Sequence, residues 1–203
     1  MLLIISYFLI GILSRGTQYK YFYNHPLMIN PINWVLATFN HGSFSHLIGN
    51  LLFLIFLGMV VEAKVGQGRW LLYYFIAALV SGFADAFFRG IFQAKIPSLG
   101  ASGAISGLAG AAALLSPYTF PLGKYKFPFP VFLVAWLMVY SDFSYIGSSD
   151  SISHVAHLGG FGSLFVTYFF LNSKEQEELK IGFILNFTFF VLSIILLWLL
   201  KNR

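Results

Sequence analysis

Long apolar runs separated by short polar stretches dominate the chain, and they predict membrane-spanning helices. The hydropathy pattern gives seven candidate spans at residues 2–13, 44–61, 70–88, 102–115, 129–143, 154–171 and 181–200. The connecting segments are short and contain most of the prolines, lysines and arginines. We therefore expect an all-α membrane protein with a single domain over residues 1–203. Its core is a six-helix bundle over about residues 1–172, followed by a seventh, C-terminal transmembrane helix over about residues 181–200.

Two segments fit this pattern less well. The first span has about twelve residues, which rise only ~18 Å against a hydrocarbon layer of ~30 Å. Either this helix continues through residues 19–23, or the chain begins later than related chains do. Residues 172–180 are the most hydrophilic piece of the chain and are expected to form a solvated connector between the sixth and seventh helices.

The composition agrees with a membrane location. Hydrophobic residues make up 58% of the chain and charged residues 9%, against roughly 25% charged residues in an ordinary soluble domain. The formal net charge is +5, but the basic residues are scattered singly through loops, as expected beside a membrane and not for nucleic-acid binding. Lysine and arginine are shared equally between the two sides, so charge does not decide the orientation. The absence of cysteine excludes thiol catalysis.

Polar residues gather where three of the predicted helices begin. The second, fourth and sixth helices run in the same direction, so their N-terminal ends open toward the same face of the membrane. These ends lie in the polar stretches 39–50, 100–103 and 153–160. The fourth helix rises only ~22 Å, so its start is expected below the surface. Irregular backbone at that depth requires enclosure by protein or a watery cavity.

A lone hydroxyl stands among small residues at the start of the fourth span. Gly100 can adopt backbone angles closed to other residues, so the chain can turn sharply into a helix there. Small neighbours leave the Ser102 Oγ approachable, and the first N–H groups of a helix point toward any developing negative charge. Gly103 and Gly107 have the spacing that lets another membrane helix approach closely. Ser102 is therefore a candidate nucleophile, with a plain packing surface as the alternative.

His157 is the candidate base for this serine, because ionisable groups inside membrane spans mark functional sites by default. It follows the start of the sixth span by about one turn, and Gly160 behind it allows close contact with the small face of the fourth span. A neutral imidazole accepting the Ser102 proton forms a Ser–His dyad. We expect no full triad, because Asp142 and Asp150 are assigned to the other end of the fifth helix and to the following loop. A histidine bonded to a backbone carbonyl is the alternative.

Two further polar side chains are expected to face the same point. His46 and Asn50 are four residues apart and therefore share one helix face. Together with the Ser102 N–H they are natural donors to an oxyanion, and one such donor can contribute roughly 10² to 10³ in rate. Polar contacts between helices are the alternative explanation.

These motifs, taken in order, resemble those of the rhomboid intramembrane serine proteases over about residues 33–172. The matching pieces are HGSFSHLIGN (41–50), then Gly58, Glu62, Gly66 and Arg69, then GASG (100–103), then AHLGG (156–160). The resemblance implies a six-helix core, Ser102 as nucleophile and His157 as general base. It implies an oxyanion hole of His46, Asn50 and the Ser102 amide. The chain departs from the family where Trp34 is followed by Val35 instead of arginine.

The resemblance also assigns supporting roles and a setting. His41 and His154 are polar residues near the site, and Glu62 is structural, at the far end of the second helix; Gly100, Gly103, Gly107 and Gly160 are structural glycines. The N-terminus lies in the cytoplasm, in a plasma or inner membrane, and the site opens to the periplasmic or extracellular side. The partners are transmembrane-helix substrates and the lipid bilayer, with no cofactor, metal or nucleic acid. The polar loop 144–153 is expected to cap the cavity.

Three other functions compete with this interpretation. A catalytically inactive rhomboid-like protein that binds membrane clients is disfavoured, because both the serine and the histidine are present. A metal site of His41, His46, His154 and His157 is disfavoured, because there is no His-Glu-x-x-His motif and no carboxylate is expected beside these histidines. A channel or transporter is disfavoured by the lack of midplane charges and of an inverted repeat.

Overall fold

Helices form in each of the seven apolar runs of the sequence. The computed structural model describes residues 1–92, 96–146 and 153–201. Its helices are α1 (Leu2–Ile12), α2 (Arg15–Tyr21), α3 (Pro31–Ala37), α4 (Phe44–Val65), α5 (Gln67–Ile91), α6 (Ser102–Leu115), α7 (Val131–Ser144), α8 (His154–Gly162), α9 (Leu164–Thr167), the 3₁₀ helix η1 (Tyr168–Phe170) and α10 (Ser173–Lys201). Within the described residues, α4, α5 and α10 are long and apolar enough to cross a membrane, and α1, α6 and α7 are shorter apolar helices.

The first predicted span ends at α1 without continuing into the following segment, and the sixth is interrupted. Helix α1 ends at Ile12, and α2 begins a new helix after Ser14, whose side chain accepts a hydrogen bond from the Thr17 N–H (3.2 Å). A first helix continuing through residues 19–23 is therefore wrong. The sixth span is divided at Ser163, whose N–H is shared between the carbonyls of Gly159 (3.1 Å) and Gly160 (3.0 Å).

The hydrophilic piece before the last helix is helical, and its prediction as a connector is wrong. Asn172 accepts a hydrogen bond from the Glu175 N–H (2.9 Å), and the Glu175 carboxylate accepts one from the Asn172 N–H (3.0 Å). This reciprocal cap starts a helix at its first turn. Glu175 also pairs with Arg69 at 2.5 Å, and Glu178 pairs with Lys64 at 3.2 Å. The first turns of α10 are thereby tied to the α4–α5 corner.

A short β-hairpin joins α6 to α7. Strands β1 (Thr119–Leu122) and β2 (Tyr125–Pro128) pair antiparallel, with Leu122 opposite Tyr125 beside the turn. Gly123 in the turn has φ +59, which glycine adopts without strain. The ring of Phe120 stacks on Phe56 of α4, with 4.7 Å between centroids. The sequence analysis did not anticipate this hairpin.

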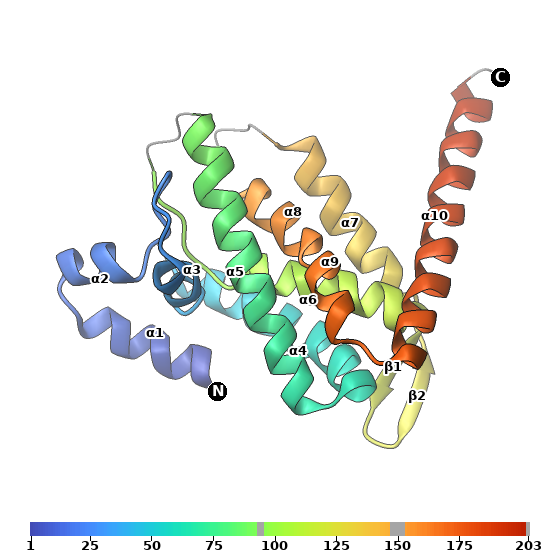
Figure 1. Cartoon of the computed structure of the whole chain (residues 1–203), viewed down its shortest axis with the longest axis horizontal. Coiled ribbons are helices and arrows are strands. Elements are labelled where there is room, and N and C mark those ends of the chain that lie inside the picture. Colours follow the sequence, from blue (N-terminus) through green and yellow to red (C-terminus); the bar gives the residue numbers. More distant parts are fainter. Residues whose placement is uncertain (93–95, 147–152, 202–203) are drawn as a thin grey trace.

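Helix α6 lies at the centre of the bundle. It packs against α4, α5, α7, α8 and α10, and its residues from Gly103 to Ala113 are all buried. Helices α1 and α2 lie at one edge of the molecule and α10 lies at the opposite edge (Figure 1). The Asn186 amide of α10 donates to the Ala113 carbonyl of α6 (3.1 Å) and accepts from Trp136 of α7 (2.9 Å). The last helix is thus bonded to the central one.

Candidate active site

The chain turns into α6 at Gly100. This glycine has φ +116, and its N–H donates to the carbonyl of Ala37 (2.9 Å). A Cβ at this position would lie 2.8 Å from the His46 ring, so a side chain is excluded by both the dihedral angle and the space. Ser102 follows as the first residue of α6. The N–H groups of a first helical turn have no carbonyl partner within their own helix, so they are available to an anion beside Ser102.

Helix α8 brings an imidazole to this hydroxyl. The helix begins at His154, and the preceding Ser153 caps it by accepting a hydrogen bond from the Ala156 N–H (3.3 Å). His157 lies one turn further, and its Nε2 is 2.8 Å from the Ser102 Oγ. This separation is within the range over which a base can remove a hydroxyl proton.

Glycines allow α6 and α8 to approach this closely. A Cβ at Gly160 would lie 1.9 Å from the Gly103 carbonyl oxygen, and a Cβ at Gly107 would lie 3.0 Å from the Gly160 carbonyl oxygen of α8. A Cβ at Gly103 would likewise lie 3.3 Å from the Ala156 carbonyl oxygen of α8. The predicted contact between the small faces of the fourth and sixth spans is therefore present in the structure, and it sets the distance between the helices that contain Ser102 and His157.

A carboxylate lies beside the histidine, contrary to the sequence-based expectation. Asp142 Oδ1 is 2.8 Å from His157 Nδ1 and 2.9 Å from His154 Nδ1. Asp142 belongs to the last turn of α7, and consecutive antiparallel helices place the end of one next to the start of the following one. Assigning Asp142 to the opposite end from the site was therefore wrong. The argument that no carboxylate adjoins these histidines is wrong for the same reason.

The two predicted oxyanion donors lie on α4. His46 is in the first turn of α4, and its ring lies against the backbone of Gly100, two residues before Ser102. Asn50 is buried one turn further along, and its side-chain amide donates to the His46 carbonyl (2.9 Å). An amide nitrogen has two hydrogens, so this bond uses only one of them. The structure thus places the His46 ring beside the turn that precedes Ser102, with Asn50 one turn further along the same helix.

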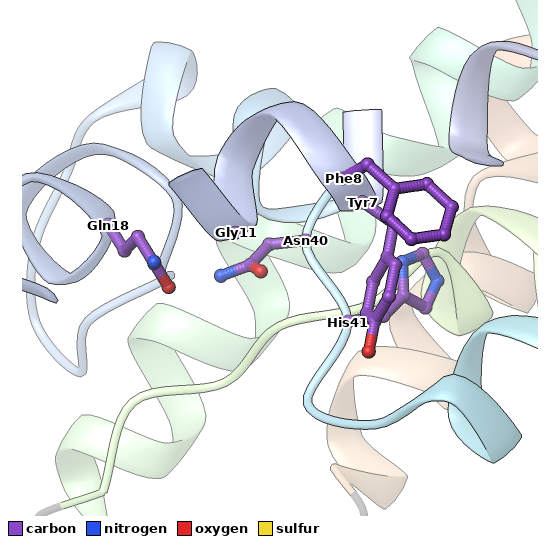
Figure 2. Close-up of a pocket in the computed structure, with 6 residues that line it drawn as sticks. All are labelled: Tyr7, Phe8, Gly11, Gln18, Asn40 and His41. Atoms are coloured by element: carbon purple, nitrogen blue, oxygen red, sulfur yellow. The ribbon is translucent and has the colours of Figure 1, made fainter. Parts of the chain in front are cut away.

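His41 lies behind His46 and lines a cavity. Its ring centroid is 5.1 Å from that of His46, and its side chain is buried, with neither ring nitrogen bonded to any of the described residues. The cavity measures about 340 Å³ and is lined by Tyr7, Phe8, Gly11, Gln18, Asn40 and His41 (Figure 2). Burial, helped by the nearby charge of His46, lowers the pKa of His41 to about 4. His41 is therefore neutral at physiological pH.

The remaining predicted residues fall into separate places. His154 joins the Asp142–His157 group, and the donor atoms of these three side chains lie within 4.8 Å of one another, a spacing that could hold a metal ion. His41 and His46 are not members of this group, so it is not the four-histidine site considered above. Glu62 lies near the far end of α4 with an exposed side chain. The proposed lid, 144–153, includes residues 147–152, which lie outside the described residues.

A second buried carboxylate, which sequence reasoning missed, accepts hydrogen bonds from three segments around the site. Asp85 of α5 is 1% exposed. It accepts hydrogen bonds from the Asn24 amide (2.9 Å), from the Ser98 hydroxyl in the segment before α6, and from the Ser153 hydroxyl that caps α8. The Asp85 side chain thereby bonds both the segment that leads into α6 and the residue that caps α8. Asp85 is an acid inside an apolar span, and that was the available signal.

The fold and this geometry define a helical membrane protein with a half-buried serine–histidine pair between two helices. The family model for the Rhomboid domain matches residues 30–174, and the chain belongs to the rhomboid family. It is therefore a multi-pass membrane protein, and the family resemblance seen in its motifs is confirmed.

Individual relatives agree with this assignment. The chain is 32% identical to RHOMBOID-like protein 1 of Arabidopsis thaliana over 147 residues, which cover 70% of this chain and 36% of the relative. It is 29% identical to Rhomboid protein 1, mitochondrial, of Saccharomyces cerevisiae over 72% of this chain and 43% of the relative. It is 28% identical to Presenilin-associated rhomboid-like protein, mitochondrial, of Mus musculus over 76% of this chain and 42% of the relative. The matched region thus spans less than half the length of these relatives.

Proposed function

We propose that this protein is an intramembrane serine endopeptidase that cleaves peptide bonds in or near the transmembrane helices of other membrane proteins. The observation that supports this most directly is the 2.8 Å contact between Ser102 Oγ and His157 Nε2. Membership of a family that contains many serine proteases supports it further.

The reaction follows from the roles that this geometry allows. His157 Nε2 takes the Ser102 proton as the Oγ attacks the substrate carbonyl carbon, and the carbonyl oxygen becomes an oxyanion. The Ser102 N–H, His46 and Asn50 stabilise that charge. His157 then gives its proton to the leaving amine, and the C–N bond breaks to leave an acyl-enzyme. Water, activated by His157 in the same way, hydrolyses the ester and restores Ser102.

The substrate has to present extended backbone. An intact helix uses its carbonyl groups in its own hydrogen bonds, so a substrate helix must unwind locally before a carbonyl can reach Ser102. We therefore expect preference for substrates with glycine, proline or other weak helix formers near the cleaved bond.

The proposal includes an architecture and a setting. The chain is one domain, in which α1, α4, α5, α6, α7 and the α8–α9–η1 segment form a six-helix core and α10 is an additional seventh span. The core lies in a plasma or inner membrane, with the N-terminus in the cytoplasm and Ser102 toward the periplasmic or extracellular side. The lid role of the loop 144–153 belongs to this proposal and is testable by limited proteolysis, which should cut that loop before any helix.

The deciding experiment compares single-residue variants in one membrane preparation. Ser102→Ala and His157→Ala should each abolish cleavage of a model transmembrane substrate, and Ser102→Ala should also abolish labelling by a fluorescent fluorophosphonate. Asn50→Ala should retain activity reduced by roughly 10²-fold or more. Ser193→Ala is the matched control, because its hydroxyl lies on α10 and donates only to the Phe189 carbonyl. Cleavage that persists in Ser102→Ala would refute the proposal, and an unreactive wild type would favour the client-binding alternative.

A further inference from the structure

At the junction of α7 and α8, one carboxylate oxygen is hydrogen-bonded to two imidazole rings. Asp142 is 3% exposed, and its Oδ1 lies 2.8 Å from His157 Nδ1 and 2.9 Å from His154 Nδ1. The His154 ring is in turn stacked near Tyr145, with 6.1 Å between ring centroids. The carboxylate at the end of α7 is therefore held by two side chains from the first turns of α8.

This arrangement fixes which nitrogen of His157 bears the proton. An ionised carboxylate can only accept hydrogen bonds, so the Nδ1 of each histidine must be the donor. A neutral His157 with its proton on Nδ1 has an unprotonated Nε2. That Nε2 is the atom 2.8 Å from the Ser102 Oγ, so the tautomer set by Asp142 is the one that can accept the serine proton.

We propose that Asp142 is a positioning residue that extends the Ser102–His157 pair to a triad, with His154 as the second donor that holds the carboxylate in place. This inference rests on the proposed function of Ser102 and His157. When the Ser102 proton moves to His157 Nε2, the imidazole becomes a cation 2.8 Å from Asp142. The Asp142 carboxylate stabilises that cation, and the proton leaves again from Nε2 to the amine of the broken peptide bond.

A purely structural role for Asp142 makes a different prediction. If the side chain only joined α7 to α8, then asparagine would serve, because its Oδ1 also accepts a hydrogen bond and its shape is the same. Asparagine has no negative charge, however, and its NH₂ group can instead donate to His157 Nδ1, which favours the tautomer with the proton on Nε2. Asp142→Asn therefore separates tautomer control from helix packing.

The kinetic test compares Asp142→Asn with Ser141→Ala, a control on the same turn of α7 whose side chain is exposed. Asp142→Asn should lower kcat for a transmembrane substrate by roughly 10² to 10⁴-fold with little change in KM, as expected for loss of the orienting acid in a serine triad. Ser141→Ala should match the wild type. An Asp142→Asn kcat equal to that of Ser141→Ala overturns the inference while leaving the proposed function of Ser102 intact.

A spectroscopic test does not require an active enzyme. In protein labelled with ¹⁵N-histidine, the nitrogen shifts distinguish a protonated from an unprotonated ring nitrogen, and the His157 signals are assigned by their loss in His157→Ala. The unmodified protein should show His157 protonated on Nδ1 near neutral pH. His157 protonated on Nε2 overturns the inference. A wild type that cleaves no substrate refutes the proposed function instead, and the tautomer still decides the role of Asp142.

Discussion

Replacing Gly160 by alanine is expected to push α8 away from α6 and to inactivate the protein. The added Cβ would lie 1.9 Å from the Gly103 carbonyl oxygen, whereas Cβ atoms essentially never approach other atoms closer than 3.0 Å. The obstacle is helix backbone in a close-packed interior, so it cannot rotate away, and the helices must move apart by about 1 Å. Overpacking of this kind costs about 1–3 kcal/mol of stability.

The displacement acts directly on the reacting groups. Gly103 follows Ser102 in the chain, and Gly160 lies about one turn beyond His157 on α8. A misplacement of about 1 Å between reacting groups can lower a rate by ~100-fold. Gly160→Ala should therefore react with a serine-directed probe about two orders of magnitude more slowly than the wild type, while it remains folded at a lower unfolding temperature.

The assay is the rate of fluorophosphonate labelling of Ser102, measured in the detergent used to record thermal unfolding. Gly162→Ala is the matched control, because it lies on the same helix and nothing lies within 4 Å of its added Cβ. That control should label at the wild-type rate. Equal labelling of the two alanine variants would show that the α6–α8 spacing does not set the Ser102–His157 distance, and the reasoning would be refuted.

Three further outcomes follow from the buried polar groups. Asp85→Ala should lower the free energy of unfolding by about 3 kcal/mol or more, because several buried donors lose their acceptor. Glu177→Ala, at an exposed residue, should leave that free energy unchanged. Equal denaturation curves for the two variants would contradict this prediction. Because the pKa of His41 is lowered to about 4 in the folded state and is about 6.5 unfolded, the unfolded chain gains the proton first as the pH falls. Stability should then be lost between about pH 6.5 and pH 4, and His41→Gln should remove part of that loss in melting curves; an identical pH dependence in the variant would count against it. Asn186→Leu removes the hydrogen bonds from α10 to α6 and α7. It should lower the unfolding temperature modestly, because interhelical hydrogen bonds in membranes contribute about 0.6–2 kcal/mol. Activity should remain, and a loss of fluorophosphonate labelling of Ser102 would mean that α10 shapes the site.

Hydropathy predicted the central helices well because burial in lipid and burial in protein select the same residues. The range 102–115 for α6 is the clearest case, since small residues and a glycine turn mark its start. The pattern failed where local hydrogen bonds decide the structure. The reciprocal cap between Asn172 and Glu175 makes a charged segment helical, and the hairpin around Gly123 forms in a segment rich in proline and aromatic residues that has no hydropathy signal.

The candidate site was predictable where residue type and motif order coincide, as for Ser102 and His157. Asp142 was assigned to the wrong end of its helix and Asp85 was missed, although both are acids inside apolar segments and the cost of burying a charge in a membrane protein marks them as residues with partners. Their partners come from other helices and loops, so sequence spacing alone could not identify them. Helix direction was sufficient to place Asp142, because the last turn of α7 must lie near the first turn of α8.

The burial of α6 has a consequence for how the surrounding lipid acts on this protein. Every residue from Gly103 to Ala113 is buried by neighbouring helices, so the helix that begins with Ser102 has almost no surface in contact with acyl chains. Changes in bilayer thickness or lipid order can reach the hydroxyl only by tilting or shifting the outer helices. The composition of the membrane should therefore alter how readily a substrate enters, and it should leave the resting alignment of the two reacting side chains largely unchanged.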